Sequence, residues 1–190
     1  MDLIALWASG AHFIPCSAAL AWGFAEGSFF FVVPDVLLMS FALFSPRQGF
    51  LACAGALAGA LLAGALLYLL SARRPAAMHR LVERVPFVRP YMWTYVHNDL
   101  ETLGWLAIRK GPLRGIPYKL YAVEAPCCLS LPAFLAASIP GRLERFLVLT
   151  VVASLAGWAF HGFIHRHPLT AIAIHLAAWT AFYARYWATI

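Results

Sequence analysis

The run from Gly49 to Leu70 holds no charged residue and no proline, and a membrane-spanning helix needs about 20 such apolar residues. The apolar residues of the chain come in unbroken runs of this kind, not in the period-two alternation of a transmembrane β-barrel. Composition agrees, because 63% of the 190 residues are hydrophobic and 12% are charged, with a mean hydropathy of +0.76. We therefore predict an all-α integral membrane protein, a single polytopic domain over residues 1–190 with about four to six membrane segments.

Two carboxylates lie inside apolar sequence near the N-terminus. Between Leu3 and Phe44 there is no Lys or Arg, and Glu26 and Asp35 are the only acids. This stretch is long enough for two crossings, but Pro34 interrupts its second half. A re-entrant helical hairpin is the alternative, in which protein or a water-filled cavity satisfies the non-helical backbone.

An ionised carboxylate at the bilayer centre costs roughly 2.5–3.5 kcal/mol, so such residues usually have a function. On one straight helix Glu26 and Asp35 would lie about 13 Å apart along the axis and point to opposite faces. A hairpin bent near Gly27 or Pro34 would bring them together, and we expect either acid to serve as a proton carrier. The alternative is that both cap helices at the membrane edges.

A second interrupted segment runs from Leu103 to Gly141, which is largely apolar but rich in proline. We expect no continuous helix through these prolines, and infer a second broken, partly re-entrant hairpin that mirrors the first. The alternative is an interfacial loop followed by one kinked helix from about Tyr121 to Ala137.

Basic side chains lie in or beside this apolar sequence, and Arg can form bidentate hydrogen bonds with phosphate. We expect them to bind a phosphate headgroup or to pair with Glu26, Asp35, Glu124 and Glu144. For Arg142 and Arg145, anchoring at the cytoplasmic membrane surface is an equally good account. The candidates are Arg109, Arg114, Lys119, Arg142 and Arg145.

The segment from Arg73 to Arg89 carries five Arg against a single Glu83. This charge excess predicts that residues 73–101 form a cytoplasmic or interfacial loop. Its first part is expected either to lie on anionic headgroups, with Leu81, Val82 and Val85 facing lipid, or to be a solvated loop.

Helices are also predicted over Phe146–Phe163 and, as a C-terminal membrane helix, over residues 169–190. His161, His165 and His167 leave a metal-dependent role open. The four cysteines form no CxxC pair, so we expect neither a disulfide framework nor a zinc site, and no cofactor. The start Met1-Asp2-Leu3 lacks the basic region of a cleavable signal peptide.

The stretch FAEGSFFFVVPDVLL resembles the acidic, proline-containing re-entrant segment of the DedA superfamily, also called the VTT or SNARE-associated domain. Glu26 matches the first acid of that segment, and Asp35, directly after Pro34, matches the second. Further on, GIPYKLYAVEAP and SIPGRLERF resemble the YqaA-type branch, with its Pro-Tyr-Lys and Gly-Arg-x-x-Arg-Phe motifs. The matching residues there are Pro117, Tyr118, Lys119, Gly141, Arg142, Arg145 and Phe146, and the resemblance covers residues 20–160.

The resemblance implies lipid movement across a bacterial inner membrane, such as flipping of undecaprenyl phosphate or of phospholipid headgroups. Its partners would be an anionic lipid, protons and the bilayer, with no nucleic acid, and the protein would be a transporter that could form a homo-oligomer. Two other classes stay open: an integral-membrane metal-dependent lipid enzyme and a non-catalytic membrane assembly subunit. The Ser-Gly-His segment of common membrane phosphatases and the Gly-x-Ser-Gly of rhomboid-type proteases are absent from the sequence.

Overall fold

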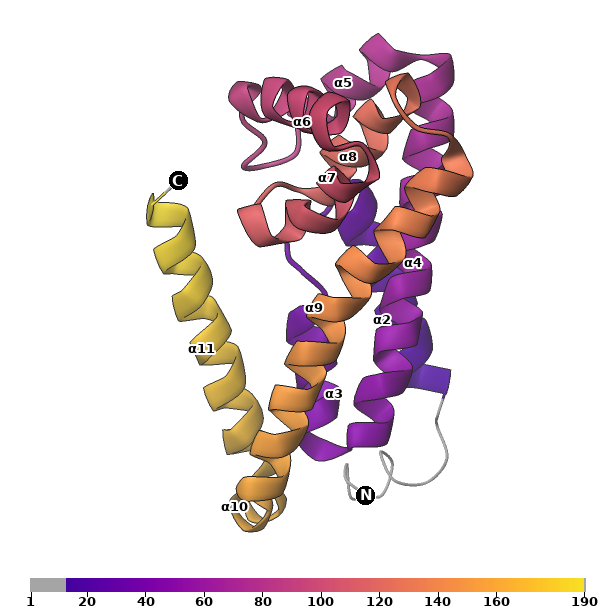
Figure 1. Cartoon of the computed structure of the whole chain (residues 1–190). Coiled ribbons are helices and arrows are strands. Elements are labelled where there is room, and N and C mark those ends of the chain that lie inside the picture. The colour runs from indigo at the N-terminus through magenta and orange to yellow at the C-terminus, as the bar shows by residue number, and fades with distance from the viewer. Residues whose placement is uncertain (1–12, 190) are drawn as a thin grey trace.

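A computed structural model describes residues 13–189, and over that range the chain forms helices and turns without a β-strand (Figure 1). The predicted all-α class is therefore confirmed, while the expectation for Met1-Asp2-Leu3 lies outside the described residues. The α-helices are α2 (Phe13–Ser28), α3 (Asp35–Phe44), α4 (Pro46–Arg73), α5 (Pro75–Glu83), α6 (Pro90–Leu103), α7 (Trp105–Lys110), α8 (Tyr118–Glu124), α9 (Leu131–Ala159), α10 (His161–Arg166) and α11 (Pro168–Thr189). Two 3₁₀ turns, η1 (Gly111–Arg114) and η2 (Ala125–Cys127), flank α8.

Several helices of this fold start at a proline. Pro46, Pro75, Pro90 and Pro168 each open a helix, where the missing backbone N–H would have no partner within the helix in any case. At the start of α4 the Ser45 side chain also accepts a hydrogen bond from the backbone of the first turn. Prolines therefore set where most of the chain reversals occur.

The first broken element is a hairpin whose tip lies halfway along the molecule. Helix α2 ends at Ser28, the chain reverses through the non-helical residues 29–34, and α3 starts at Asp35 and runs back to the end from which α2 came (Figure 1). The two arms contact each other little, because α2 packs along α4 while α3 packs mainly against α9. The break near Pro34 thus agrees with the expected hairpin.

Helices α2 and α4 approach closely along a face of small residues. A β-carbon added at Gly55 would overlap the carbonyl oxygen of Cys16, and one at Gly59 would overlap that of Leu20. Small-residue faces of this type let helix backbones come together. The glycines of α4 therefore position α2, and with it Glu26.

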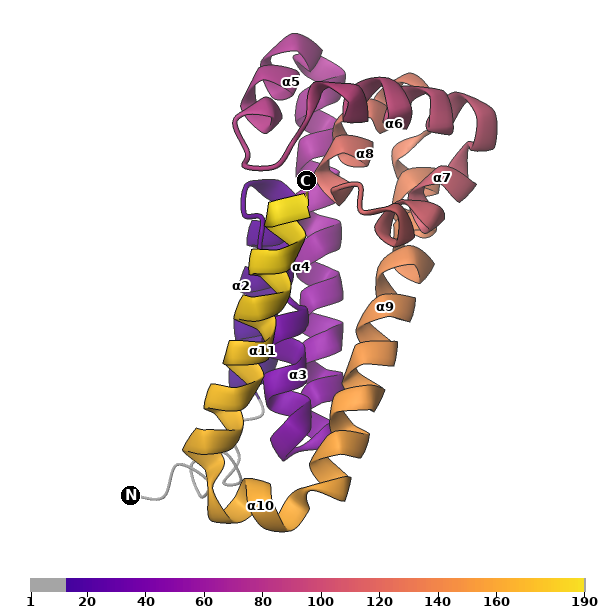
Figure 2. The same cartoon turned by 90° about the vertical axis from the view of Figure 1, so that its left-hand side faces the viewer.

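The second broken element comprises α7, η1 and α8 and enters from the opposite end of the molecule (Figure 2). We expected the interrupted segment to continue to Gly141. This expectation is wrong, because α9 is a continuous helix from Leu131 to Ala159 and contains Pro140. One proline removes one helical hydrogen bond and kinks a helix without having to end it. Packing on both sides of Pro140 holds α9 together, since Phe134 and Phe146 are fully buried. The helix predicted over Phe146–Phe163 therefore starts too late, because α9 already begins at Leu131. It also ends too late, because α9 ends at Ala159 and α10 begins at His161.

The basic segment forms the amphipathic helix α5 and the turn after it, and we call the end of the molecule that carries it the basic end. The expectation that Leu81, Val82 and Val85 all face lipid is wrong for Val82, which is 1% exposed and packs in the core. Leu81 is exposed, and Val85 lines a cavity. Because Leu81 and Val82 are neighbours on a helix, they point to different faces, and one of them faces the protein.

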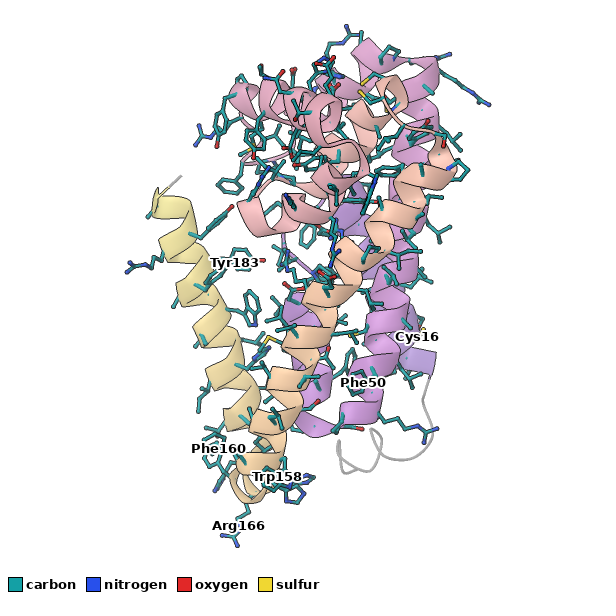
Figure 3. The ribbon with its side chains drawn as sticks, viewed as in Figure 1. Cys16, Phe50, Trp158, Phe160, Arg166 and Tyr183 are labelled. Carbon is teal, nitrogen blue, oxygen red and sulfur yellow. The ribbon has the colours of Figure 1, made fainter. Side chains whose placement is uncertain are left out.

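Helix α11 stands apart from the other helices and is joined to them through α10 at the end opposite the basic end (Figures 1 and 2). Its Tyr183 points toward the bundle (Figure 3), and the Tyr183 hydroxyl accepts a hydrogen bond of 3.0 Å from the backbone N–H of Val33. His175 Nε2 lies 3.1 Å from the Val36 carbonyl oxygen. Contacts with the first hairpin therefore hold α11 beside the bundle.

By length and apolar composition, one helix among residues 13–189 is able to cross a membrane, namely α4 with its 28 residues. At 1.5 Å per residue it is about 42 Å long. Buried apolar residues form two clusters, one at the basic end around Tyr121 and Phe134 and one in the other half around Leu38 and Phe146. Along α9, Arg142 lies between the residues that belong to these two clusters, so buried charge separates the two apolar regions.

Candidate functional site

A cavity of about 640 Å³ lies between the first hairpin, α8, α9 and α11. Five charged side chains line it, and three are cations while two are carboxylates: Glu26, Asp35, Lys119, Arg142 and Arg145. All five are residues that the sequence singled out. The cavity therefore carries one excess positive charge when every group is ionised, which favours an anionic ligand.

Glu26 and Arg142 form a buried ion pair. Arg142 donates hydrogen bonds of 2.8 Å and 3.4 Å to the two carboxylate oxygens, and the side chains are 4% and 9% exposed for Arg142 and Glu26. Glu26 lies in the last turn of α2, where the helix dipole disfavours a negative charge. Arg142 therefore supplies the opposite charge that pairs with this buried carboxylate.

Asp35 pairs with Arg145, one turn further along α9. Asp35 is the first residue of α3, a position that the helix dipole favours for an acid. Its side chain is 1% exposed, and its Oδ1 has no hydrogen-bond partner although it is buried. Arg142 Nε is buried and without a partner in the same way. Unsatisfied buried polar atoms of this kind are costly, and they leave hydrogen-bonding capacity for a bound group.

Lys119 joins the two broken elements directly. Its Nζ donates a hydrogen bond of 2.7 Å to the carbonyl oxygen of Phe30, in the non-helical tip of the first hairpin. The residue is 2% exposed, and no carboxylate lies within ion-pair distance of it among the described residues. Lys119 therefore satisfies the broken backbone of one hairpin while bringing a cation from the other.

The Tyr118 ring packs against the Arg142 guanidinium. The Arg142 guanidinium carbon lies 4.2 Å from the centre of the Tyr118 ring, which is a cation–π contact. The Tyr118 hydroxyl donates to Ser138 Oγ at 3.0 Å, and it leaves no room for a side chain at Gly64 of α4. The ring that packs against Arg142 is thus itself held in place by Ser138 and by its close approach to α4.

Helix α11 forms another wall with one face of mostly aromatic side chains, which the sequence interpretation missed. His175, Trp179, Phe182, Tyr183 and Tyr186 all line the cavity. Their spacing of three to four residues is that of a single helix face, and this spacing was the available signal. The cavity is therefore charged on the bundle side and largely aromatic on the α11 side.

Two predicted headgroup ligands lie outside the cavity lining. Arg109 pairs with Glu144 on the surface, where the side chains are 47% and 56% exposed. Arg114 donates to Asp99 at 2.8 Å and to the Tyr95 hydroxyl at 2.6 Å. Both residues therefore form ion pairs outside the cavity lining.

The remaining predicted residues have supporting positions. Pro34 and Pro117 both line or border the cavity as the residues that precede α3 and α8. Gly141 lets α9 approach α7, since a β-carbon there would lie 3.0 Å from Arg109 Cα. Glu124 points to the basic end, where its carboxylate lies 2.7 Å from His79 Nε2.

The histidines near the α10 turn do not gather a ligand set. The His161 and His165 rings lie 4.0 Å apart, but within the described part of the chain no third metal-binding side chain joins them. Among residues 13–189, the one group of at least three possible metal ligands lies elsewhere, at His97, Glu124 and Cys127.

The charged cavity can bind and release an anion by exchanging ion-pair partners. A phosphate offers several oxygens that can replace the carboxylates as hydrogen-bond acceptors for Arg142 and Arg145. No family model matches this chain, and no curated protein or solved structure is significantly similar to it.

Proposed function

We propose that this protein is a membrane lipid translocase that moves an anionic headgroup, a phospholipid or undecaprenyl phosphate, across a bacterial cytoplasmic membrane. The observation that carries the proposal is the set of three cations and two carboxylates, all but Arg145 buried, in the cavity where the tips of two oppositely directed hairpins meet. The sequence resemblance to the DedA superfamily supports the same class. Proton coupling through Glu26 or Asp35 is part of the proposal.

A membrane setting is supported by the outer surface of the long helices. Large apolar side chains are exposed along the outer faces of α4, α9 and α11, well beyond the isolated examples that soluble proteins show. They include Leu62, Leu66, Leu69, Val148, Val152, Leu155, Ile174 and Leu176. We propose that these faces contact lipid, with α9 and α11 accompanying α4 through the bilayer.

In this setting the two broken elements are re-entrant, one from each membrane surface. Their non-helical tips meet inside protein, as irregular backbone at membrane depth requires. The basic end, with α5, faces the cytoplasm because Arg-rich segments stay on that side.

The transport step is an exchange of partners. A lipid phosphate enters beside α11 and accepts hydrogen bonds from Arg142, Arg145 and Lys119, displacing Glu26 and Asp35. The cavity volume of about 640 Å³ suits a headgroup, so the acyl chains stay in the bilayer beside α11. Protonation of a displaced acid keeps it neutral until the phosphate leaves, and its deprotonation restores the ion pair.

The proposal is tested by flipping of a fluorescent phosphatidylglycerol in proteoliposomes, read by quenching of the outer leaflet. Each charge-assisted hydrogen bond to the phosphate is worth about 1.5–3 kcal/mol. Arg145→Gln and Lys119→Met are therefore expected to lower the flipping rate about 10- to 100-fold.

The matched control is Arg47→Gln, which removes an exposed Arg at the start of α4, remote from the cavity. This variant should flip lipid at the wild-type rate. Unchanged rates in Arg145→Gln and Lys119→Met, or an equal loss in Arg47→Gln, would contradict the assignment of the site.

A further inference from the structure

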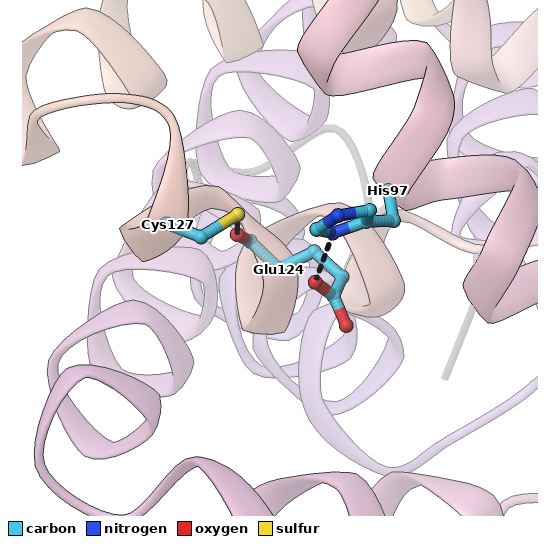
Figure 4. Close-up of side chains that lie close together, drawn as sticks. All are labelled: His97, Glu124 and Cys127. Atoms are coloured by element: carbon cyan, nitrogen blue, oxygen red, sulfur yellow. Dashed lines mark hydrogen bonds and ion pairs between the residues drawn. The ribbon is translucent and has the colours of Figure 1, made fainter.

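A second cluster of reactive side chains lies at the basic end, outside the charged cavity. It is built from α5, α6 and the end of α8, and its members are His79, His97, Glu124, Cys127 and Cys128. Figure 4 shows three of them converging, with the dashed line marking the contact between His97 and Glu124.

Glu124 is the centre of the cluster. One carboxylate oxygen lies 2.7 Å from His79 Nε2, and the other lies 3.4 Å from His97 Nδ1. The Glu124 side chain is 11% exposed, whereas the His97 side chain is 46% exposed, so an ion can reach the cluster from solvent. The carboxylate therefore already brings two imidazoles from different helices to one place.

Two thiols complete the set. The ligand atoms of His97, Glu124 and Cys127 all lie within 4.8 Å of one another. The sulfur of Cys128 lies 2.9 Å from that of Cys127, and both residues are exposed and uncrosslinked. Cys127 Sγ also donates to the Glu124 carbonyl oxygen at 2.9 Å, which holds this thiol beside the carboxylate.

We propose that this cluster is a Zn²⁺ site. Zinc favours imidazole, thiolate and carboxylate ligands in tetrahedral geometry. With bonds of about 2.0–2.3 Å, the ligand atoms of such a site stand about 3.3–3.8 Å apart, so small side-chain rotations bring the present atoms into place. Magnesium and calcium favour ligand sets made of oxygen atoms, whereas this set offers one carboxylate beside two imidazoles and two thiols.

The surroundings of the histidines support this assignment. A metal-bound imidazole usually directs its second nitrogen to a carboxylate, and His97 Nε2 lies 3.3 Å from Glu101 Oε1 while Nδ1 faces the cluster. The His79 ring is stacked on Trp93 with the ring centres 4.1 Å apart, which fixes its orientation. Both imidazoles are therefore held in orientations that suit coordination.

The site would fasten α5 and α6 to α8, the helix that carries Lys119. Zinc would in this way stabilise the basic end and the second hairpin without entering the transport cavity. No sequence motif indicated the site, because its ligands come from three separated segments and include no CxxC pair.

Zinc binding by the purified full-length chain in detergent, measured by equilibrium dialysis with ZnCl₂ and metal analysis, tests the proposal. We expect one tightly bound zinc per chain and an affinity at least about 100-fold lower in Cys127→Ser and in His97→Gln. Cys16→Ser, which removes a thiol on α2, is the matched control and should bind as the wild type does. Equal zinc affinity in wild type, Cys127→Ser and His97→Gln would overturn the site.

A second measurement uses the wild-type protein alone and so does not depend on whether a variant folds. Zinc should slow alkylation of Cys127 and Cys128 by a maleimide, residue by residue in mass spectra, and leave alkylation of Cys16 unchanged. Identical alkylation rates with and without zinc would overturn the site. Neither measurement involves lipid, so the result of either one is independent of whether the proposed transport function is correct.

Discussion

The buried pair between Glu26 and Arg142 makes a quantitative prediction about stability. Replacing Glu26 with Met leaves the Arg142 guanidinium buried, since this side chain is 4% exposed, with its two hydrogen bonds of 2.8 Å and 3.4 Å lost. Removing one partner of a buried pair costs about 3–5 kcal/mol. The cation–π contact with Tyr118 remains, so we expect a loss within that range and not beyond it.

The double variant provides the decisive comparison. Glu26→Met and Arg142→Met together remove both charges, and apolar replacement of a whole buried pair is often neutral or stabilising. We therefore expect the double variant to be more stable than either single variant. Lys119 does not upset this comparison, because it keeps its hydrogen bond to the Phe30 carbonyl.

Thermal unfolding followed by tryptophan fluorescence in detergent measures the effect. For a chain of this size about 1 kcal/mol shifts Tm by roughly 2–4 °C, so each single variant should lose roughly 6–20 °C. The exposed pair of Arg109 and Glu144 is the matched control, and Arg109→Met should change Tm by less than about 4 °C because exposed pairs contribute about 0–1 kcal/mol. A double variant less stable than both single variants would refute the reasoning.

Two further predictions concern packing. Gly59→Leu should destabilise the contact between α2 and α4 by at least about 1–3 kcal/mol, because a side chain there overlaps the α2 backbone, and thermal unfolding against Gly162→Leu, where space is open, checks it. Tyr183→Phe should leave the Val33 N–H without its acceptor, at a cost of about 1–3 kcal/mol, and loosen α11. Faster hydrogen exchange of the Val33 amide would report this loosening, and unchanged exchange would contradict it.

The charges stranded in apolar sequence were sufficient to predict much of the site. Glu26 and Asp35 could be placed on a broken hairpin because Pro34 lies between them and because buried charge needs a partner. Their partners could not be chosen from the sequence, since Arg109 and Arg142 are equally surrounded by apolar residues. The fold decides between them: Gly141 and the packing of α9 bring Arg142 to Glu26, while Arg109 points to the surface.

Two features depended on tertiary packing and were therefore missed. A helix through Pro140 depends on buried neighbours on both sides of the kink, which no local pattern reports. The contribution of α11 depends on its return beside the first hairpin, held by Tyr183 and His175. Its aromatic face was visible as helical spacing, but nothing in the sequence indicated that the face borders a charged cavity and not lipid.

The central claim is that the cations lining the cavity select a lipid by its headgroup charge. The most direct test compares flipping of fluorescent phosphatidylglycerol and phosphatidylcholine by the wild-type protein in otherwise identical proteoliposomes. Because the cavity carries one excess positive charge and offers charge-assisted hydrogen bonds worth about 1.5–3 kcal/mol each, we predict that phosphatidylglycerol moves about tenfold faster or more. Equal rates for the two lipids, or rates no higher than in protein-free liposomes, would contradict the account.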